Sequence, residues 1–111
     1  MTESVWIGGC QVWSLLDMIP PPYEVDDFFP SVPANAWDPY REVALTSEGR
    51  LQLYYGCFAI RSQGKLAIID TGMGPGPHPE RGNRRGNLIN AMAAEGLVPE
   101  DVDFVVHSHL H

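Results

Sequence analysis

Short apolar and polar runs alternate near the start of the chain, which predicts β structure there. Apolar and β-prone residues fill most of Val5–Leu16. They flank Gly8-Gly9, a dipeptide suited to the positive φ of a two-residue hairpin turn. We therefore expect the chain to open with a β-hairpin.

A second alternating run begins at Leu51 and predicts another hairpin. Its apolar positions switch from odd to even numbers at Gly56, which indicates a bulge or a change of register there. The loop Ser62-Gln63-Gly64 then turns the chain, and residues 65–70 return as a strand.

Helical periodicity follows in one segment only. Three apolar residues of Asn87–Glu95 share a helical face, Asn87 stands at the N-cap position, and Gly96 and Pro99 end the helix. Consecutive apolar residues in Val102–Val106 predict a strand covered on both faces. Strand, loop, helix and strand in this order predict an α/β unit.

Residues 20–48 show no period of 2 or 3.6 and are dense in proline, acidic and aromatic residues. We expect a long excursion with a short helix near Trp37, because loops of this length in compact domains are usually functional or disordered. Its aromatic side chains favour a packed loop, in which they either anchor the loop or wall an apolar substrate pocket. The candidate pocket residues are Phe28, Phe29 and Trp37.

Composition narrows the classes of function. The chain has 111 residues, the length of one domain or of part of one, and is 44% hydrophobic, as in soluble globular proteins. Its net charge of −7 argues against a nucleic-acid partner. No apolar run approaches the ~20 residues that span a bilayer, and the start lacks signal-peptide features, so we expect a cytoplasmic protein without membrane contact. Cys10 and Cys57 form no CxxC pair and are predicted to be reduced.

The glycine-rich loop after Asp70 does not fit a nucleotide site. Pro77 stands where the third glycine of G-x-G-x-x-G belongs, and no Lys-Ser/Thr pair follows. The loop carries a small basic cluster, which we interpret as solvated, with anion binding as the alternative. This cluster consists of Arg81, Arg84 and Arg85.

Two of the predicted buried strands end in residues that can do chemistry, at Asp70-Thr71-Gly72 and at residues 107–111. Sites of open α/β sheets form beyond the carboxyl ends of strands. Residues two apart in extended chain lie on one side, about 7 Å apart, so the imidazoles of His-x-His can reach one metal ion. The spacing leaves open whether the pair is His107 with His109 or His109 with His111.

These residues carry a resemblance to a known family. The stretches GCFAIRSQGKLAIIDTGMGPG (Gly56 to Gly76) and GLVPEDVDFVVHSHLH (Gly96 to His111) resemble the N-terminal part of metallo-β-lactamase-fold hydrolases. Within that superfamily the chain is similar to the group of quorum-quenching N-acyl-homoserine lactonases and organophosphate hydrolases. The resemblance implies the N-terminal half of a four-layer αββα fold, here an α/β half-domain of mostly strands with one short helix.

The family motif H-x-H-x-D-H, usually preceded by Thr or Ser, assigns roles by resemblance. Its first half matches Ser108 to His111, so His109 and His111 are implied metal ligands and His107 a neighbour. Asp70 matches the strand-end aspartate that braces the metal-binding loop. Its alternative role is to cap the turn before Thr71.

The same resemblance implies the cofactors and partners. Two divalent ions are implied, zinc first, with iron, manganese and cobalt also suited to such donors. A small-molecule ester or lactone is the implied substrate, and a homodimer of the full-length protein is compatible with the resemblance. The motif breaks off at His111, so we expect residues 1–111 to be a partial, catalytically incomplete domain.

Two other functions fit parts of the sequence. Asp70-Thr71-Gly72 also matches the signature of aspartic proteases, which can work as dimers that share one aspartate per subunit. A split half-domain that acts only as a binding module is the non-enzymatic alternative.

Overall fold

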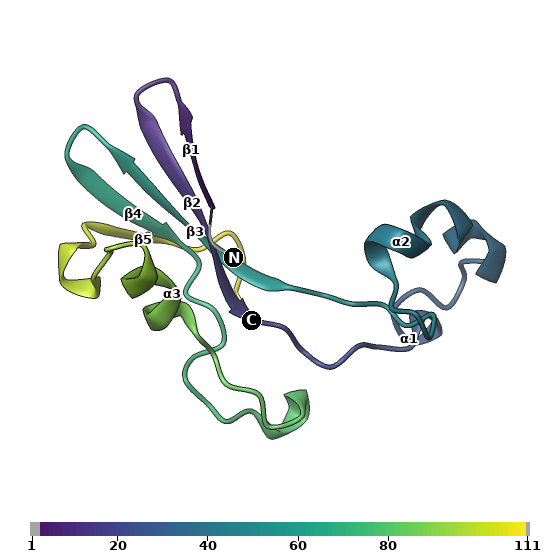
Figure 1. Ribbon diagram of the computed structural model, residues 1–111. Helices are drawn as coiled ribbons and strands as arrows, with labels where there is room; N and C mark the ends of the chain where they lie inside the picture. The colour runs from purple at the N-terminus through teal and green to yellow at the C-terminus, as the bar shows by residue number, and fades with distance from the viewer. Residues whose placement is uncertain (1–2, 111) are drawn as a thin grey trace.

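The strands form one sheet in the order of the sequence (Figure 1). The structure is a computed structural model and describes residues 3–110. Strands β1 to β4 pair antiparallel, and β5 pairs parallel to β4. The strands are β1 (Glu3–Ile7), β2 (Cys10–Met18), β3 (Tyr55–Ser62), β4 (Lys65–Ile69) and β5 (Phe104–Val106).

Both predicted hairpins are confirmed. Ile7 pairs with Cys10, which leaves Gly8-Gly9 as a two-residue turn. Ser62 pairs with Lys65, so the second turn is Gln63-Gly64, with φ values of 50° and 75°. Positive φ at both central residues is the geometry that matches the twist of an antiparallel pair.

The predicted irregularity near Gly56 is confirmed, but the extra residue lies on the partner strand. Leu16 pairs with Gly56 and Met18 pairs with Tyr55, so Asp17 of β2 is the unpaired bulge residue. The expectation of a strand from Leu51 was wrong, because β3 begins only at Tyr55.

One helix covers one face of the sheet (Figure 1). It is α3 (Leu88–Ala94), within the predicted segment, and Gly96 at φ 73° ends it as expected. Leu97 N donates to Met92 O, and Gly96 N donates to Ala93 O, which together satisfy two terminal carbonyls. The core lies between this helix and alternate residues of three strands, namely Trp13, Leu15, Cys57, Ala59, Leu66, Ile68, Ala91, Met92 and Leu97.

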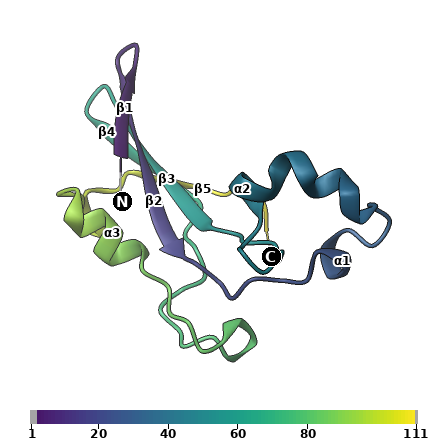
Figure 2. The same cartoon turned by 45° about the vertical axis from the view of Figure 1, so that its right-hand side comes forward.

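The excursion forms a small lobe away from the sheet (Figure 2). It holds α1 (Val25–Phe28), a 3₁₀ helix (Ala34–Tyr40) that confirms the helix expected near Trp37, and α2 (Arg41–Ala44). Two further 3₁₀ turns, Pro79–Arg81 and Pro99–Asp101, lie in the loops on either side of α3.

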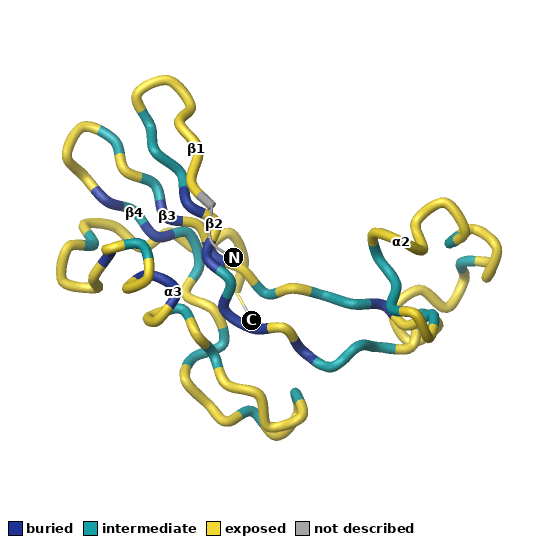
Figure 3. Tube along the Cα trace, in the orientation of Figure 1, coloured by how far each residue is buried: buried dark blue, intermediate teal, exposed yellow. Residues whose placement is uncertain are grey.

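The sheet is open on one face and at the β5 edge (Figure 3). The radius of gyration is 16.5 Å, against ~13 Å for a compact chain of this length. The expectation that 102–106 is covered on both faces was wrong for these residues, because Phe104, Val105 and Val106 are each about half exposed. Consecutive apolar residues at an uncovered edge indicate a surface that further structure covers in a complete domain.

Both cysteines are free thiols, with Cys57 buried and Cys10 half-buried, as predicted. Within residues 3–110, no helix has the length and apolar character needed to cross a membrane.

Candidate functional site

The parallel pairing of β4 and β5 brings the two chemically capable strand ends together. Ile69 pairs with Val106, and Asp70 N donates to Val106 O at 2.8 Å. The residues that follow each strand therefore leave the same edge of the sheet side by side. Asp70 therefore lies next to the histidine-rich segment.

Both carboxylate oxygens of Asp70 are held by Ser108. Ser108 N donates to Oδ1 at 2.8 Å, and Ser108 Oγ donates to Oδ2 at 2.6 Å. Asp70 has φ 65°, in the left-handed region, where aspartate is tolerated better than most side chains. The aspartate thus holds the start of the segment after β5, while no described contact shows it capping its own turn.

The contacts of Asp70 also keep it ionised. The two hydrogen bonds from Ser108 lower the pKa of the carboxyl, and the nearby rings of His109 and His107 lower it further. Their Nδ1 atoms lie 3.9 Å and 4.0 Å from the carboxylate. A fixed negative charge at this position favours a cation beside it.

Ser108 also fixes the ring of His109. Its Oγ lies 2.7 Å from Nδ1 of His109. Since the single hydroxyl proton of Ser108 goes to Asp70, the hydroxyl oxygen must accept from Nδ1–H. Neutral His109 then carries its proton on Nδ1 and its lone pair on Nε2, the form in which an imidazole binds a metal ion.

The described donors fit a metal ion only in part. His111, the other implied ligand, lies outside the described residues, and residues 3–110 contain no group of three or more His, Cys, Asp or Glu side chains arranged to hold a metal ion. What the described residues supply is one imidazole in a metal-binding tautomer, together with the carboxylate and hydroxyl that orient it.

Asp17 is a functional candidate that the sequence did not reveal. It is 3% exposed, and its carboxylate accepts three backbone N–H groups. Oδ2 accepts from Met73 N at 2.9 Å, while Oδ1 accepts from Asn87 N at 2.9 Å and Leu88 N at 3.1 Å. The β2 bulge thereby ties the loop after β4 to the start of α3.

This contact explains two features of the loop. Asn87 occupies the N-cap position of α3 but makes no side-chain cap, because Asp17 takes that role. A Cβ at Gly72, where φ is 72°, would overlap the Asp17 carboxylate. The glycine of Asp70-Thr71-Gly72 is thus required by a buried acid from a distant strand.

A cavity of about 510 Å³ lies against the histidine segment. His107, His109 and Asp70 contribute to its wall, as does Phe28 from the aromatic lobe. Phe29 and Trp37 do not line this cavity, so the structure brings only one of the three candidate pocket aromatics to it. Its remaining lining residues are Leu53, Tyr54, Tyr55, Gly56, Thr71, Gly72, Met73, Arg81 and Leu110.

Phe29 and Trp37 pack behind Phe28 in a chain of ring contacts. The centroids of Phe28 and Phe29 are 6.2 Å apart, and those of Phe29 and Trp37 are 5.5 Å apart. Phe28 also meets Tyr23 edge-on at 4.8 Å. Contacts among these aromatic side chains therefore stabilise the lobe, and they place Phe28 against the cavity.

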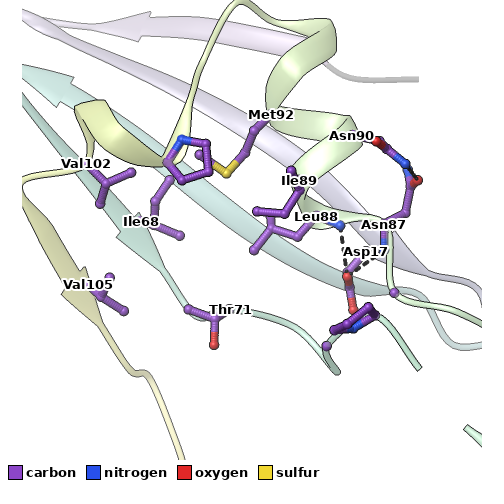
Figure 4. Close-up of a pocket in the computed structure, with 14 residues that line it drawn as sticks. Asp17, Ile68, Thr71, Asn87, Leu88, Ile89, Asn90, Met92, Val102 and Val105 are labelled. Atoms are coloured by element: carbon purple, nitrogen blue, oxygen red, sulfur yellow. Dashed lines mark hydrogen bonds between the residues drawn. The ribbon is translucent and has the colours of Figure 1, made fainter. Parts of the chain in front are cut away.

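A second, apolar groove of about 470 Å³ lies between α3 and the β4–β5 edge (Figure 4). Its walls include Leu88 and Met92 on the helix and Ile68 and Val105 on the strands. Asp17 closes one end through its bonds to the helix start. Its lining includes Val105, a half-exposed residue of β5.

Comparison with known proteins shows the fold. No family model and no curated protein sequence matches the chain. Among solved structures, a probable metal-dependent hydrolase from Staphylococcus aureus superposes with a TM-score of 0.77 at 22% identity over 96% of the chain. AidC, a dizinc quorum-quenching lactonase in complex with a product, gives 0.79 at 18% identity over 99%. AbOPH, a hydrolase of the β-lactamase superfamily, gives 0.67 at 24% identity over 99%.

The chain spans 36–40% of the length of these structures. It therefore has the fold of part of a metallo-β-lactamase-type domain, an α/β half-domain built mainly from a five-stranded sheet. This outcome confirms the fold class expected from the sequence.

Proposed function

We propose that the full product of this gene is a metal-dependent hydrolase whose metal-binding loop begins at His109. The observation that carries this proposal is the hydrogen-bonded chain Asp70–Ser108–His109, which sets the tautomer of an imidazole at the meeting point of two strand ends. The shared fold with metal-dependent hydrolases supports it. The remaining ligands are proposed to come from polypeptide beyond residues 1–111.

His109 and His111 would bind the first of two divalent ions, for which zinc is the first choice and iron, manganese and cobalt are alternatives. When bound, such ions make hydroxide available near neutral pH and polarise a substrate carbonyl. Asp70 limits the motion of His109 by holding Ser108 through two bonds.

The cavity beside His109 supports a small-molecule ester or lactone as substrate. Phe28 and Leu110 give it apolar surface, and Asp70, Arg81 and His109 give it polar groups. AidC is a lactonase and was solved with a product bound. We propose that an acyl chain lies against Phe28, which Phe29 and Trp37 support from behind.

The aspartic-protease alternative finds no support in the structure. A helix and a parallel strand pair follow Asp70-Thr71-Gly72, whereas those proteases are nearly all β. In addition, both Asp70 oxygens are bonded to Ser108 of the same chain.

The proposed activity is tested with the full gene product and an N-acyl-homoserine lactone. We expect ring opening that a chelator abolishes and added zinc restores. Asp70→Ala should lower kcat/KM by about 10- to 100-fold, the usual effect of losing a group that orients a metal ligand. Asp38→Ala, a change to an exposed carboxylate paired only with Arg41, is the control and should leave kcat/KM unchanged.

Two outcomes would contradict the proposal. Lactone opening at full rate in the presence of chelator would show that the reaction needs no metal ion. A full-length protein that binds metal but opens neither lactones nor esters would show that these compounds are not its substrates. A binding module that completes its sheet with another polypeptide would show neither metal binding nor hydrolysis.

A further inference from the structure

Arg81 lies in the wall of the cavity that also holds His107 and His109. It ends the 3₁₀ turn Pro79–Arg81 in the long loop after β4. Its Nε donates to Tyr55 Oη at 3.2 Å, and its Nη1 donates to Glu80 O at 3.2 Å. Two fixed bonds therefore orient the guanidinium, unlike a solvated arginine.

Tyr55 is itself anchored. It begins β3, and its hydroxyl shares a 3.0 Å hydrogen bond with the hydroxyl of Tyr23. Tyr23 in turn packs on Phe28, another residue of the cavity wall. The sheet, the aromatic lobe and the loop after β4 thus all contribute to the position of Arg81.

Arg81 forms no ion pair within the described structure, because the charge of Glu80 acts on it only from beyond ion-pair distance. Arg41 and Arg50 pair with nearby carboxylates, but within residues 3–110 no carboxylate lies within 4.0 Å of Arg81. The other two arginines of this loop, Arg84 and Arg85, are exposed and line no part of this cavity, although Arg85 Nη1 donates to Gly76 O at 3.3 Å.

We propose that Arg81, oriented by Tyr55, binds an anionic group of the substrate in the cavity that His107 and His109 also line. A guanidinium with a fixed orientation loses little freedom on binding a carboxylate and forms charge-assisted hydrogen bonds to it. The substrate class is therefore an ester or lactone that carries a carboxylate. This inference rests on the proposed hydrolase function, and it names a group that decides specificity.

The test measures how the zinc-loaded full gene product hydrolyses two esters that differ only in their terminal group. Mono-4-nitrophenyl glutarate carries a terminal carboxylate, and 4-nitrophenyl pentanoate has a methyl group in its place. We expect kcat/KM to be at least about tenfold higher for the glutarate ester. Arg81→Gln should abolish this preference through a higher KM for the glutarate ester, with kcat/KM for the pentanoate ester changed less than about twofold.

Two further variants separate binding from folding. Arg84→Gln removes an equal charge from the same loop but outside the cavity, and it should keep the full preference. Tyr55→Phe keeps Arg81 but removes the hydroxyl that orients it, and it should reduce the preference by about two- to fivefold. No charge preference in the wild type, or an equal loss for both esters in Arg81→Gln, would overturn the proposal while the hydrolase function stands.

A titration of glutarate into the zinc-loaded protein gives a readout that needs no turnover. Glutarate affinity should fall about tenfold in Arg81→Gln and stay unchanged in Arg84→Gln. If the protein hydrolyses neither these esters nor the lactone, the proposed function fails, and this titration alone decides on the anion site. Equal glutarate affinity in wild type and Arg81→Gln would overturn it.

Discussion

Single residues far apart in the sequence hold the site in place, and Asp17 is the clearest example. Its carboxylate accepts three backbone N–H groups from residues 56 to 71 positions away. Asp70, at the end of β4, performs a similar task through its hydrogen bonds with Ser108. Together they fix both the loop after β4 and the segment after β5.

We expect Asp17→Ala to destabilise the full gene product by about 3 kcal/mol or more, because it leaves three buried donors without an acceptor. Chemical denaturation of the metal-free protein measures this, since bound metal would add its own stabilisation. The exposed change Asp38→Ala should cost less than about 0.5 kcal/mol. Equal unfolding free energies for the two variants would show that Asp17 does not tie these elements together.

Cys57 gives a second prediction at this scale. Burial raises the pKa of its thiol to about 11, and the charges of Asp17 and Asp70 add to the effect. At pH 8 only about one molecule in a thousand therefore carries the reactive thiolate. Iodoacetamide labelling followed by peptide mapping should find Cys10 modified in the native protein and Cys57 modified only after unfolding. Rapid native labelling of Cys57 would contradict its burial.

At the scale of elements, the sequence predicts what is locally encoded. The turns at Gly8-Gly9 and Gln63-Gly64 and the end of α3 at Gly96 depend on neighbouring residues only, and all three are confirmed. The irregularity at Gly56 was also visible, because a register change alters the alternation of apolar residues.

The role of Asp17 was not predictable in this way. A lone aspartate at a strand end gives no signal for contacts with a loop and a helix more than 50 residues away. The different roles of the aromatic residues were not predictable either. Only the folded lobe shows that Phe28 lines the cavity while Phe29 and Trp37 pack behind it. The candidate metal ligands could be proposed from the sequence because a short motif contains them.

The β5 edge supports a prediction of its own. Phe104, Val105 and Val106 are about half exposed on a strand that has one neighbour among the described residues. Exposed apolar edges associate, so the isolated 111-residue chain should form oligomers on size-exclusion chromatography. Val105→Lys should reduce the oligomeric fraction, and Val43→Lys, at an 82% exposed position of α2, should not. An isolated chain that stays monomeric would show that this edge needs no cover.

For the whole molecule, the open face, the apolar groove along α3 and the partial ligand set have one explanation. The chain occupies 36–40% of the length of hydrolases with the same fold, and we propose that further polypeptide, longer than the chain itself, would cover the sheet and complete the proposed metal site. The 111-residue chain alone should accordingly show no hydrolysis above background. Turnover by this chain at the rate of the full gene product would contradict the proposal that further ligands are needed.

The central claim, that His109 and His111 bind metal while His107 does not, is tested most directly by elemental analysis of the full gene product. Wild type and the variants His107→Gln, His109→Gln and His111→Gln are purified identically and their bound metal is counted by mass spectrometry. We expect His107→Gln to keep the wild-type metal content and the other two variants to lose at least one ion per chain. Full metal content in His109→Gln, or loss in His107→Gln with retention in His111→Gln, would contradict the account.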